Sequence, residues 1–261
     1  MSSAALAKKL ANLAAAFSEP GAEILEVSCG DGRILSALKA KGFAVNGTNF
    51  GDYPDFPADI PVSNGVNLLE GLPFEDEAFD AVIAMEVIEH IENHRKAIAE
   101  MARVLRPGGR MILTFPNGHR VASRLSFLLY GIRKPKRKLI GFDTPIEKSF
   151  AFHNYVPELP TLAYLLSAHG LEIEALKASS CKAKSYVLYA LLWVPGALTL
   201  ANRLMFREKH LIRTGHSRRL WRWMMSPAVQ CGESLIVVAR KTGSAPVADE
   251  NIVRHLPRWA R

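Results

Sequence analysis

The feature that most constrains the fold is a strand-like run that leads into a glycine-containing turn and then into a helical segment. The run spans residues 23–28 (EILEVS), the turn is Cys29-Gly30-Asp31-Gly32, and the helical segment spans residues 33–41 (RILSALKAK). Small residues at such a turn let the backbone approach a ligand closely, and the helix N-terminus offers free N–H groups. The sequence therefore predicts a βα unit with a ligand site where its strand ends.

The same alternation of strand and helix patterns continues through the first half of the chain. Further strands are predicted at residues 43–49, 79–85 and 110–115, and a helix at residues 93–105. Strands that alternate with helices indicate βαβ units and a parallel sheet. Ligands of such sheets bind at the carboxyl ends of the strands. The expected fold class is α/β, with a doubly wound and mostly parallel sheet.

The second half has a different organisation. A helix is predicted at residues 156–169, followed by strands at residues 171–179 and 234–241. The interval between these last two strands is too long for a hairpin loop, so we expect a helical insertion there. The expected division of the chain is an N-terminal helix, a main domain in two pieces, an apolar and basic insertion and a flexible tail, at residues 1–21, 22–180 with 232–242, 181–231 and 243–261.

The insertion begins with an uncharged stretch, residues 185–202, which is interrupted by Pro195-Gly196. A single membrane span needs about 20 apolar residues, so this interrupted stretch is borderline for spanning. A helical lid over a substrate pocket and a helical hairpin in the membrane interface are the two favoured readings. Trp193, Trp221 and Trp223 with nearby arginines are typical of an interfacial position.

Composition limits the partners and the compartment. The three cysteines form no CxxC pair, so the sequence predicts neither a disulfide framework nor a metal site, and it favours a reducing, cytoplasmic location. The formal net charge of +8 favours anionic partners. Nucleic acid is disfavoured because no zinc finger or RNA-binding signature is present. An anionic membrane surface is favoured, with the protein peripheral on its inner face.

Several motifs, taken in order, resemble one family. Residues 25–33 (LEVSCGDGR) resemble the D/E-x-G-x-G-x-G motif of S-adenosylmethionine (SAM) dependent methyltransferases with the Rossmann-like fold. A dinucleotide fingerprint is less favoured because its third glycine is Leu35 here. The later motifs resemble the family's LPF-x-D-x-x-FD-x-V, E-V-x-E-H, L-K/R-P-G-G and T-x-P-N segments, at residues 72–82, 86–90, 105–109 and 114–117.

The resemblance implies roles for individual positions. It implies SAM as the cofactor and a group of SAM-binding residues: Glu26, Ser28, Cys29, Gly30, Gly32, Asn49, Asn67, Leu68, Met85 and Glu86. In this assignment Glu26 and the glycine turn hold the methionine part, and Asn49 and Asn67 lie where acidic residues usually meet the ribose and the adenine. Cys29 is expected to be there because it is small rather than reactive.

The resemblance also implies a reaction. We expect methyl transfer from SAM to a hydroxyl, or less favourably to an amine or carboxylate, on a small-molecule acceptor that is hydrophobic, lipid-linked or a glycan precursor. The candidates for a general base are His119, His153 and His90, because an imidazole near neutral pKa accepts a hydroxyl proton. For each of them, a packing role is the competing reading.

The chain departs from the family pattern at three positions. Ser28 replaces the first glycine, and Asn49 and Asn67 replace acidic residues. An amide retains hydrogen bonding to ribose but loses the charge-assisted bond, which costs on the order of 1 kcal/mol per site. The changes at Asn49 and Asn67 motivate a second hypothesis, in which the chain is a catalytically degenerate methyltransferase fold that serves as a binding or scaffold protein at the membrane.

Overall fold

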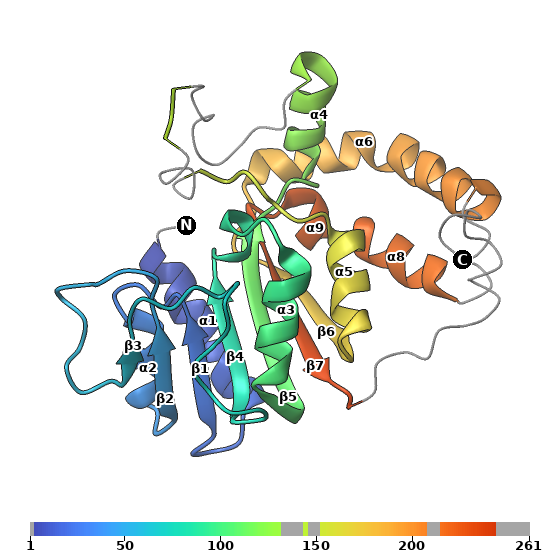
Figure 1. Cartoon of the computed structure of the whole chain (residues 1–261). Coiled ribbons are helices and arrows are strands. Elements are labelled where there is room, and N and C mark those ends of the chain that lie inside the picture. The colour runs from blue at the N-terminus through green and yellow to red at the C-terminus, as the bar shows by residue number, and fades with distance from the viewer. Residues whose placement is uncertain (1–2, 132–142, 146–151, 208–214, 244–261) are drawn as a thin grey trace.

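The computed structural model describes residues 3–131, 143–145, 152–207 and 215–243 (Figure 1). Its strands are β1 (Glu23–Val27), β2 (Ala44–Thr48), β3 (Val62–Ser63), β4 (Phe79–Met85), β5 (Leu105–Pro116), β6 (Leu171–Ala178) and β7 (Ser234–Lys241). The helices before β6 are α1 (Ser3–Phe17), α2 (Arg33–Lys39), the 3-10 turn η1 (Ile88–His90), α3 (His94–Arg103), α4 (Val121–Tyr130) and α5 (Leu159–Ala168). Between β6 and β7 lie α6 (Ala183–Asn202), the π-helical turn η3 (Arg203–Arg207), α8 (His216–Met224) and α9 (Pro227–Cys231).

The strands form one seven-stranded sheet with the order β3-β2-β1-β4-β5-β7-β6. Strands β1 to β5 pair in parallel, and β7 is antiparallel to both β5 and β6. The order reverses at β1 and β4, so their carboxyl ends flank the crevice where doubly wound sheets bind ligands. The α/β fold expected from the sequence is confirmed.

Helices cover both faces of the sheet because the inner strands are apolar on both sides. On one face α1 and α2 bury Leu10, Leu35 and Leu38 against β1, β2 and β4. On the other face α3 and α5 bury Met101 and Leu162 against β4 and β5 (Figure 1). The two layers fix the strand ends rigidly, which is what positions the loops at the carboxyl edge.

Several predicted boundaries need correction. The helix predicted at residues 93–105 ends at Arg103, and the strand predicted at residues 110–115 spans Leu105–Pro116. The cause is that Leu105 already pairs with Phe79 before a register shift next to the Pro-Gly-Gly turn. The predicted tail, residues 243–261, lies outside the described residues apart from Gly243.

The expectation that Pro195-Gly196 breaks the insertion into a helical hairpin was wrong. Helix α6 runs without interruption through Pro195. An internal proline costs a helix about 3 kcal/mol, and tertiary contacts offset that cost. The Tyr189 hydroxyl donates to the Met225 carbonyl at 2.7 Å, and Ala197 and Leu204 are buried.

Much of α6 nevertheless faces outward, in contrast to a buried lid helix. Within the described part of the chain, Ala183–Arg207 is the one helical stretch long and apolar enough, by length and composition, to cross a membrane, and only 11% of its apolar window is buried. Leu191 is 71% exposed and Leu198 is 67% exposed. The α6 face therefore presents apolar surface that the rest of the described chain does not cover.

Candidate active site at the carboxyl edge of the sheet

The turn after β1 brings backbone N–H groups to the sheet edge. Ser28, Gly30 and Gly32 have φ angles of 54°, 58° and 71°, which is the left-handed region that favours glycine. The Cys29 N–H donates to the Thr48 carbonyl at 2.9 Å, which ties the turn to the end of β2. The turn is thus a fixed, narrow loop at the N-terminus of α2, as the sequence predicts.

Glu26 is the most unusual group beside this turn. It is 1% exposed, and its Oε2 has no hydrogen-bond partner among the described residues. Burial, and next the charge of Asp31, raise the pKa of Glu26 well above its ordinary value, although a backbone hydrogen bond from Leu35 opposes the rise. A buried carboxylate oxygen without a donor fits a cationic ligand, because a positive group would supply both the missing bond and the missing charge.

Asn49, expected from the resemblance to meet the ribose, is bonded to the glycine turn in this structure. It is buried, with 2% of its surface exposed. Its Oδ1 accepts from the Gly30 N–H at 2.8 Å, and its Nδ2 donates to the Gly30 carbonyl at 3.1 Å. Both polar atoms of the side chain therefore lock the glycine turn.

Aromatic residues of the connection from β2 to β3 pack over the same turn. A Cβ at Gly32 would lie 2.7 Å from Phe56 Cε2, and a Cβ at Gly30 would lie 3.9 Å from Tyr53 Cε1. Tyr53 is 48% exposed. Sequence reasoning missed this aromatic cover, because only the fold brings the connection onto the turn.

The remaining predicted SAM-binding residues fall on neighbouring strand ends. Asn67 begins a turn, in which its Oδ1 accepts from the Leu69 N–H at 3.0 Å, and Leu68 is buried beside it. Met85 ends β4, and the next residue, Glu86, has a φ of 56°. The Glu86 N–H donates to Thr114 Oγ1 of β5 at 3.0 Å. The fold therefore places these residues along one edge with the glycine turn.

Two of the three candidate histidines lie together. The rings of His90 and His153 are 5.0 Å apart between centroids and meet edge to face. His153 Nε2 lies 3.9 Å from a carboxylate oxygen of Glu89, which is 0% exposed. His90 Nδ1 lies 3.0 Å from the Phe152 carbonyl. Glu89, His90 and His153 thus form an acid–imidazole cluster directly after β4.

Glu89 is a residue that the sequence analysis did not single out. It lies within the E-V-x-E-H segment, but nothing in the sequence places it against a histidine so far along the chain. One ligand atom from each member of the cluster lies within 4.8 Å of the others. A carboxylate with two imidazoles is also a donor set that divalent metals bind, which the pattern of spacings did not reveal.

His119 and Cys29 have different positions. His119 Nε2 accepts from the Leu159 N–H at 2.9 Å, so it satisfies the first turn of α5. Burial raises the pKa of Cys29 to about 12, so its thiol stays protonated at neutral pH. His119 is therefore a packing and capping residue in this structure, and Cys29 is a small buried residue as expected.

Comparison with known proteins agrees with this geometry. Residues 25–113 match the family model described as a methyltransferase domain. The chain is 29% identical over 163 residues to a probable S-adenosylmethionine-dependent methyltransferase of Mycolicibacterium smegmatis, which covers 59% of this chain and 53% of the relative. It is 30% identical over 108 residues to a ubiquinone biosynthesis O-methyltransferase of Pseudomonas fluorescens, which covers 37% of this chain and 45% of the relative.

The chain thus spans about half the length of these relatives. A SAM-dependent methyltransferase from Archaeoglobus fulgidus is similar in structure, with a TM-score of 0.54 and 15% identity, over 92% of this chain and 95% of that chain. At this identity the likeness concerns the fold. Residues 25–113 thus match a methyltransferase domain, the relative from Mycolicibacterium smegmatis is named as a SAM-dependent methyltransferase, and the likeness to the Archaeoglobus protein shows the fold.

Proposed function

We propose that this protein is a SAM-dependent methyltransferase that methylates a hydroxyl oxygen of a hydrophobic acceptor. The observation that carries the proposal is the unpartnered Oε2 of Glu26 beside the glycine turn, on the edge that also holds Glu89 and His153. The site for a cationic cofactor then lies at the carboxyl end of β1. The proton acceptor lies beyond the carboxyl end of β4, which pairs with β1.

The residues present fit SAM, whose zwitterionic methionine part carries an ammonium group beside the sulfonium. When bound, SAM supplies an electrophilic methyl group, which bonds to the acceptor oxygen as its bond to sulfur breaks. Glu26 would accept from the ammonium group, and the small residues of the glycine turn would let the methionine part approach the backbone closely. Met85 and Glu86 would line the acceptor side of the cofactor site, as the resemblance to the family implies.

His153 is the proposed proton acceptor, and Glu89 positions it. A carboxylate beside an imidazole fixes its orientation and stabilises the imidazolium that forms. The hydroxyl proton passes to a ring nitrogen of His153 as the oxygen is methylated. His90 packs edge to face on this ring and limits its rotation. His119 is not proposed as the base, because its Nε2 accepts from Leu159.

The proposed acceptor is hydrophobic, either lipid-linked or a glycan precursor. The support for such an acceptor is the exposed apolar surface of α4 and α6. Helix α4 follows β5 in the chain and α6 follows β6, and the two helices contact each other (Figure 1). In α4, Leu128 is 80% exposed and Tyr130 is 74% exposed. Some similar proteins are ubiquinone biosynthesis O-methyltransferases, which is consistent with such an acceptor. We also propose a cytoplasmic location, peripheral on the inner face of the membrane.

The first test is calorimetric titration with SAM and with its demethylated product. We expect micromolar binding of both, which is about −8 kcal/mol. The second step is transfer of an isotope-labelled methyl group from SAM into the organic-soluble fraction of a lipid extract. Absence of SAM binding up to millimolar concentration would contradict the proposal and favour a binding or scaffold protein. The observation that supports this alternative is that both polar atoms of the Asn49 side chain are already bonded to Gly30.

The base assignment has its own test. Replacing His153 by Gln is expected to lower kcat by about 10²- to 10⁴-fold without changing SAM affinity. Glu89→Gln is expected to displace the pH–rate profile while SAM affinity is kept. His216→Gln, an exposed replacement on α8, is the matched control. Activity is expected to survive chelator treatment, and its loss and recovery on adding a divalent metal would instead assign the cluster to metal binding.

A further inference from the structure

Helix α8 carries a concentration of basic and aromatic side chains outside the proposed active site. Its sequence is HSRRLWRWM, and it lies between η3 and α9, with contacts to both. Trp223 and Met224 turn inward and pack against the core. Arg218 and Arg222, one helical turn apart, are both exposed.

Arg219 has a structural partner, whereas Arg218 and Arg222 have none among the described residues. Arg219 donates to Glu172 Oε1 of β6 at 2.6 Å, and its guanidinium lies 5.8 Å from the centre of the Trp223 ring. This anchors α8 to the sheet. Within the described ranges, Arg218 and Arg222 form no ion pair with an acidic residue. Their charge is therefore available to an outside partner.

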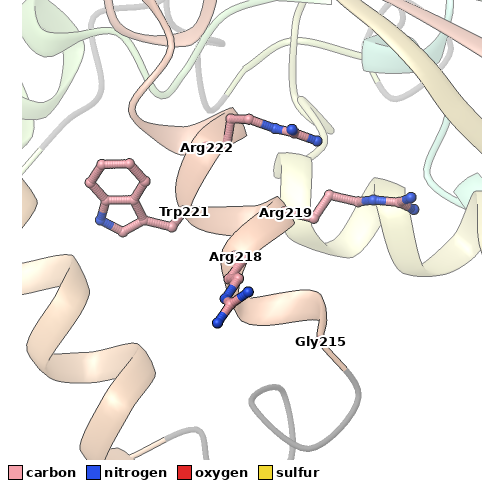
Figure 2. Close-up of a pocket in the computed structure, with 5 residues that line it drawn as sticks. All are labelled: Gly215, Arg218, Arg219, Trp221 and Arg222. Atoms are coloured by element: carbon pink, nitrogen blue, oxygen red, sulfur yellow. The ribbon is translucent and has the colours of Figure 1, made fainter.

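These side chains line a shallow recess of about 440 Å³, bounded by Gly215, Arg218, Arg219, Trp221 and Arg222. Figure 2 shows Arg219 and Arg222 extending to one side of α8, Arg218 pointing away from its first turn, and Trp221 projecting to the opposite side. Among the described residues, the recess is lined by three arginines and a tryptophan and by no acidic residue. Guanidinium groups bind phosphate oxygens through two parallel N–H donors, so the recess has the chemistry of a phosphate site.

The recess adjoins exposed apolar surface. The turn η3, which contacts α8, presents Met205 at 56% exposure and Phe206 at 68% exposure. The preceding helix α6 adds Leu198. A cationic and aromatic rim next to apolar side chains matches the boundary between lipid headgroups and acyl chains, where Trp and Arg are favoured. A nucleic acid would use the charge of α8 but would leave this apolar surface exposed to water.

We propose that the α8 recess binds the headgroup phosphates of anionic lipids, and that α6 and η3 lie against the same bilayer. The inference rests on the proposed function, because it supplies the surface from which a hydrophobic acceptor would be drawn. It adds a defined lipid site, separate from the SAM pocket. Arg219 holds the helix in place, and Arg218 and Arg222 contact the phosphates.

The test is co-sedimentation of the full chain with vesicles of phosphatidylcholine alone or with added phosphatidylglycerol. The variant replaces both Arg218 and Arg222 by Gln. Each basic residue near an anionic surface increases binding roughly fivefold, so the double variant is expected to bind the anionic vesicles about 25-fold more weakly. The control replaces Arg95 and Lys96 of α3 by Gln, which removes the same net charge from exposed positions and is expected to bind like the wild type.

Further measurements separate the alternatives. Wild-type binding that is equal for neutral and anionic vesicles, or equal losses in variant and control, would overturn the phosphate site. Binding of a single-stranded oligonucleotide without vesicle binding would assign the recess to nucleic acid instead. Inorganic phosphate is expected to compete only weakly, because it lacks the bilayer that α6 contacts.

SAM titration of each variant distinguishes this inference from the proposed function. Unchanged SAM affinity with no loss of vesicle binding contradicts only the lipid site. Failure of the wild type to bind SAM contradicts the proposed function, but it does not change what vesicle binding shows about the lipid site on α8.

Discussion

Individual residues at the glycine turn are held in states that cost the free protein stability. Glu26 buries a carboxylate oxygen without a donor, and Ser28 has a left-handed backbone that glycine adopts more readily. Asn49 opposes these costs by bonding both backbone groups of Gly30. Strain and buried charge of this kind gather at ligand sites, where the ligand provides the compensating interaction.

Glu26→Gln tests how the buried carboxyl group lowers the free energy of unfolding and how it contributes to SAM affinity. Because folding raises the pKa of Glu26, the folded state binds its proton more tightly than the unfolded chain, and the free energy of unfolding falls as pH rises from 4.5 towards the folded pKa. Denaturant titration is expected to find the variant more stable than the wild type at pH 8, with the difference lost below pH 4.5.

The same variant is expected to bind SAM about 10- to 100-fold more weakly by calorimetry, because a charge-assisted bond of about 1.5–3 kcal/mol is lost. Glu92→Gln, at an exposed position, is the control and is expected to change neither quantity. Undiminished SAM affinity in the Glu26 variant would place the ammonium group elsewhere.

Ser28→Gly tests the backbone strain. The left-handed conformation costs a residue with a Cβ about 1–2 kcal/mol, and part of the gain is offset by the freedom of glycine in the unfolded chain. We expect the free energy of unfolding to rise by about 0.5–1 kcal/mol, measured by denaturant titration. Ser28→Ala keeps the strain and removes the hydroxyl, so it is expected to give no gain; equal gains in both variants would point to the hydroxyl rather than the backbone.

At the scale of elements, the packing of β2 beneath the glycine turn keeps the site narrow. A Cβ at Gly47 would lie 2.6 Å from Cys29 Sγ and 2.9 Å from Leu35 Cδ1, so strand, turn and α2 meet without spare volume. The small size of Gly47 and Cys29 is therefore a packing requirement of this βαβ unit. The turn keeps its narrow shape only while these three elements stay in contact.

Gly47→Ala is expected to lower the free energy of unfolding by about 1–3 kcal/mol, as overpacked cores do. Cys29→Ala removes the sulfur that the new methyl group meets, so the double variant is expected to recover part of the loss. A double-mutant cycle by denaturant titration measures this coupling, and strictly additive losses would mean that the two sites do not touch.

At the scale of the whole molecule, cofactor binding and folding are linked. A ligand that binds only the folded state stabilises it by about 2.7 kcal/mol at a hundred times its dissociation constant. For a domain of this size we expect SAM to raise the melting temperature by roughly 5–10 °C. Thermal scanning with and without SAM measures the shift. The double variant at Arg218 and Arg222 is expected to show the same rise in melting temperature with SAM, because both substitutions lie on α8.

The sequence by itself determined what depends on neighbours along the chain. The strand, the glycine turn and the following helix were predictable because apolar periodicity and glycine positions are local signals. The same signals placed most SAM-binding candidates at strand ends, through the topology of parallel sheets. Only the tertiary structure decided how side chains from distant segments meet. It joined Glu89 to His153 and turned Asn49 onto Gly30.

Tertiary packing also overrode one strong local signal. Pro195-Gly196 predicts a break, yet α6 continues, because contacts of Tyr189 with Met225 and burial of Ala197 hold the helix against the body of the protein. The sequence contains the residues of α8, but only folding pairs Arg219 with Glu172 and leaves Arg218 and Arg222 without an ion-pair partner among the described residues. Local pattern fixes which elements form, and long-range packing decides which polar groups are satisfied and which remain for a ligand.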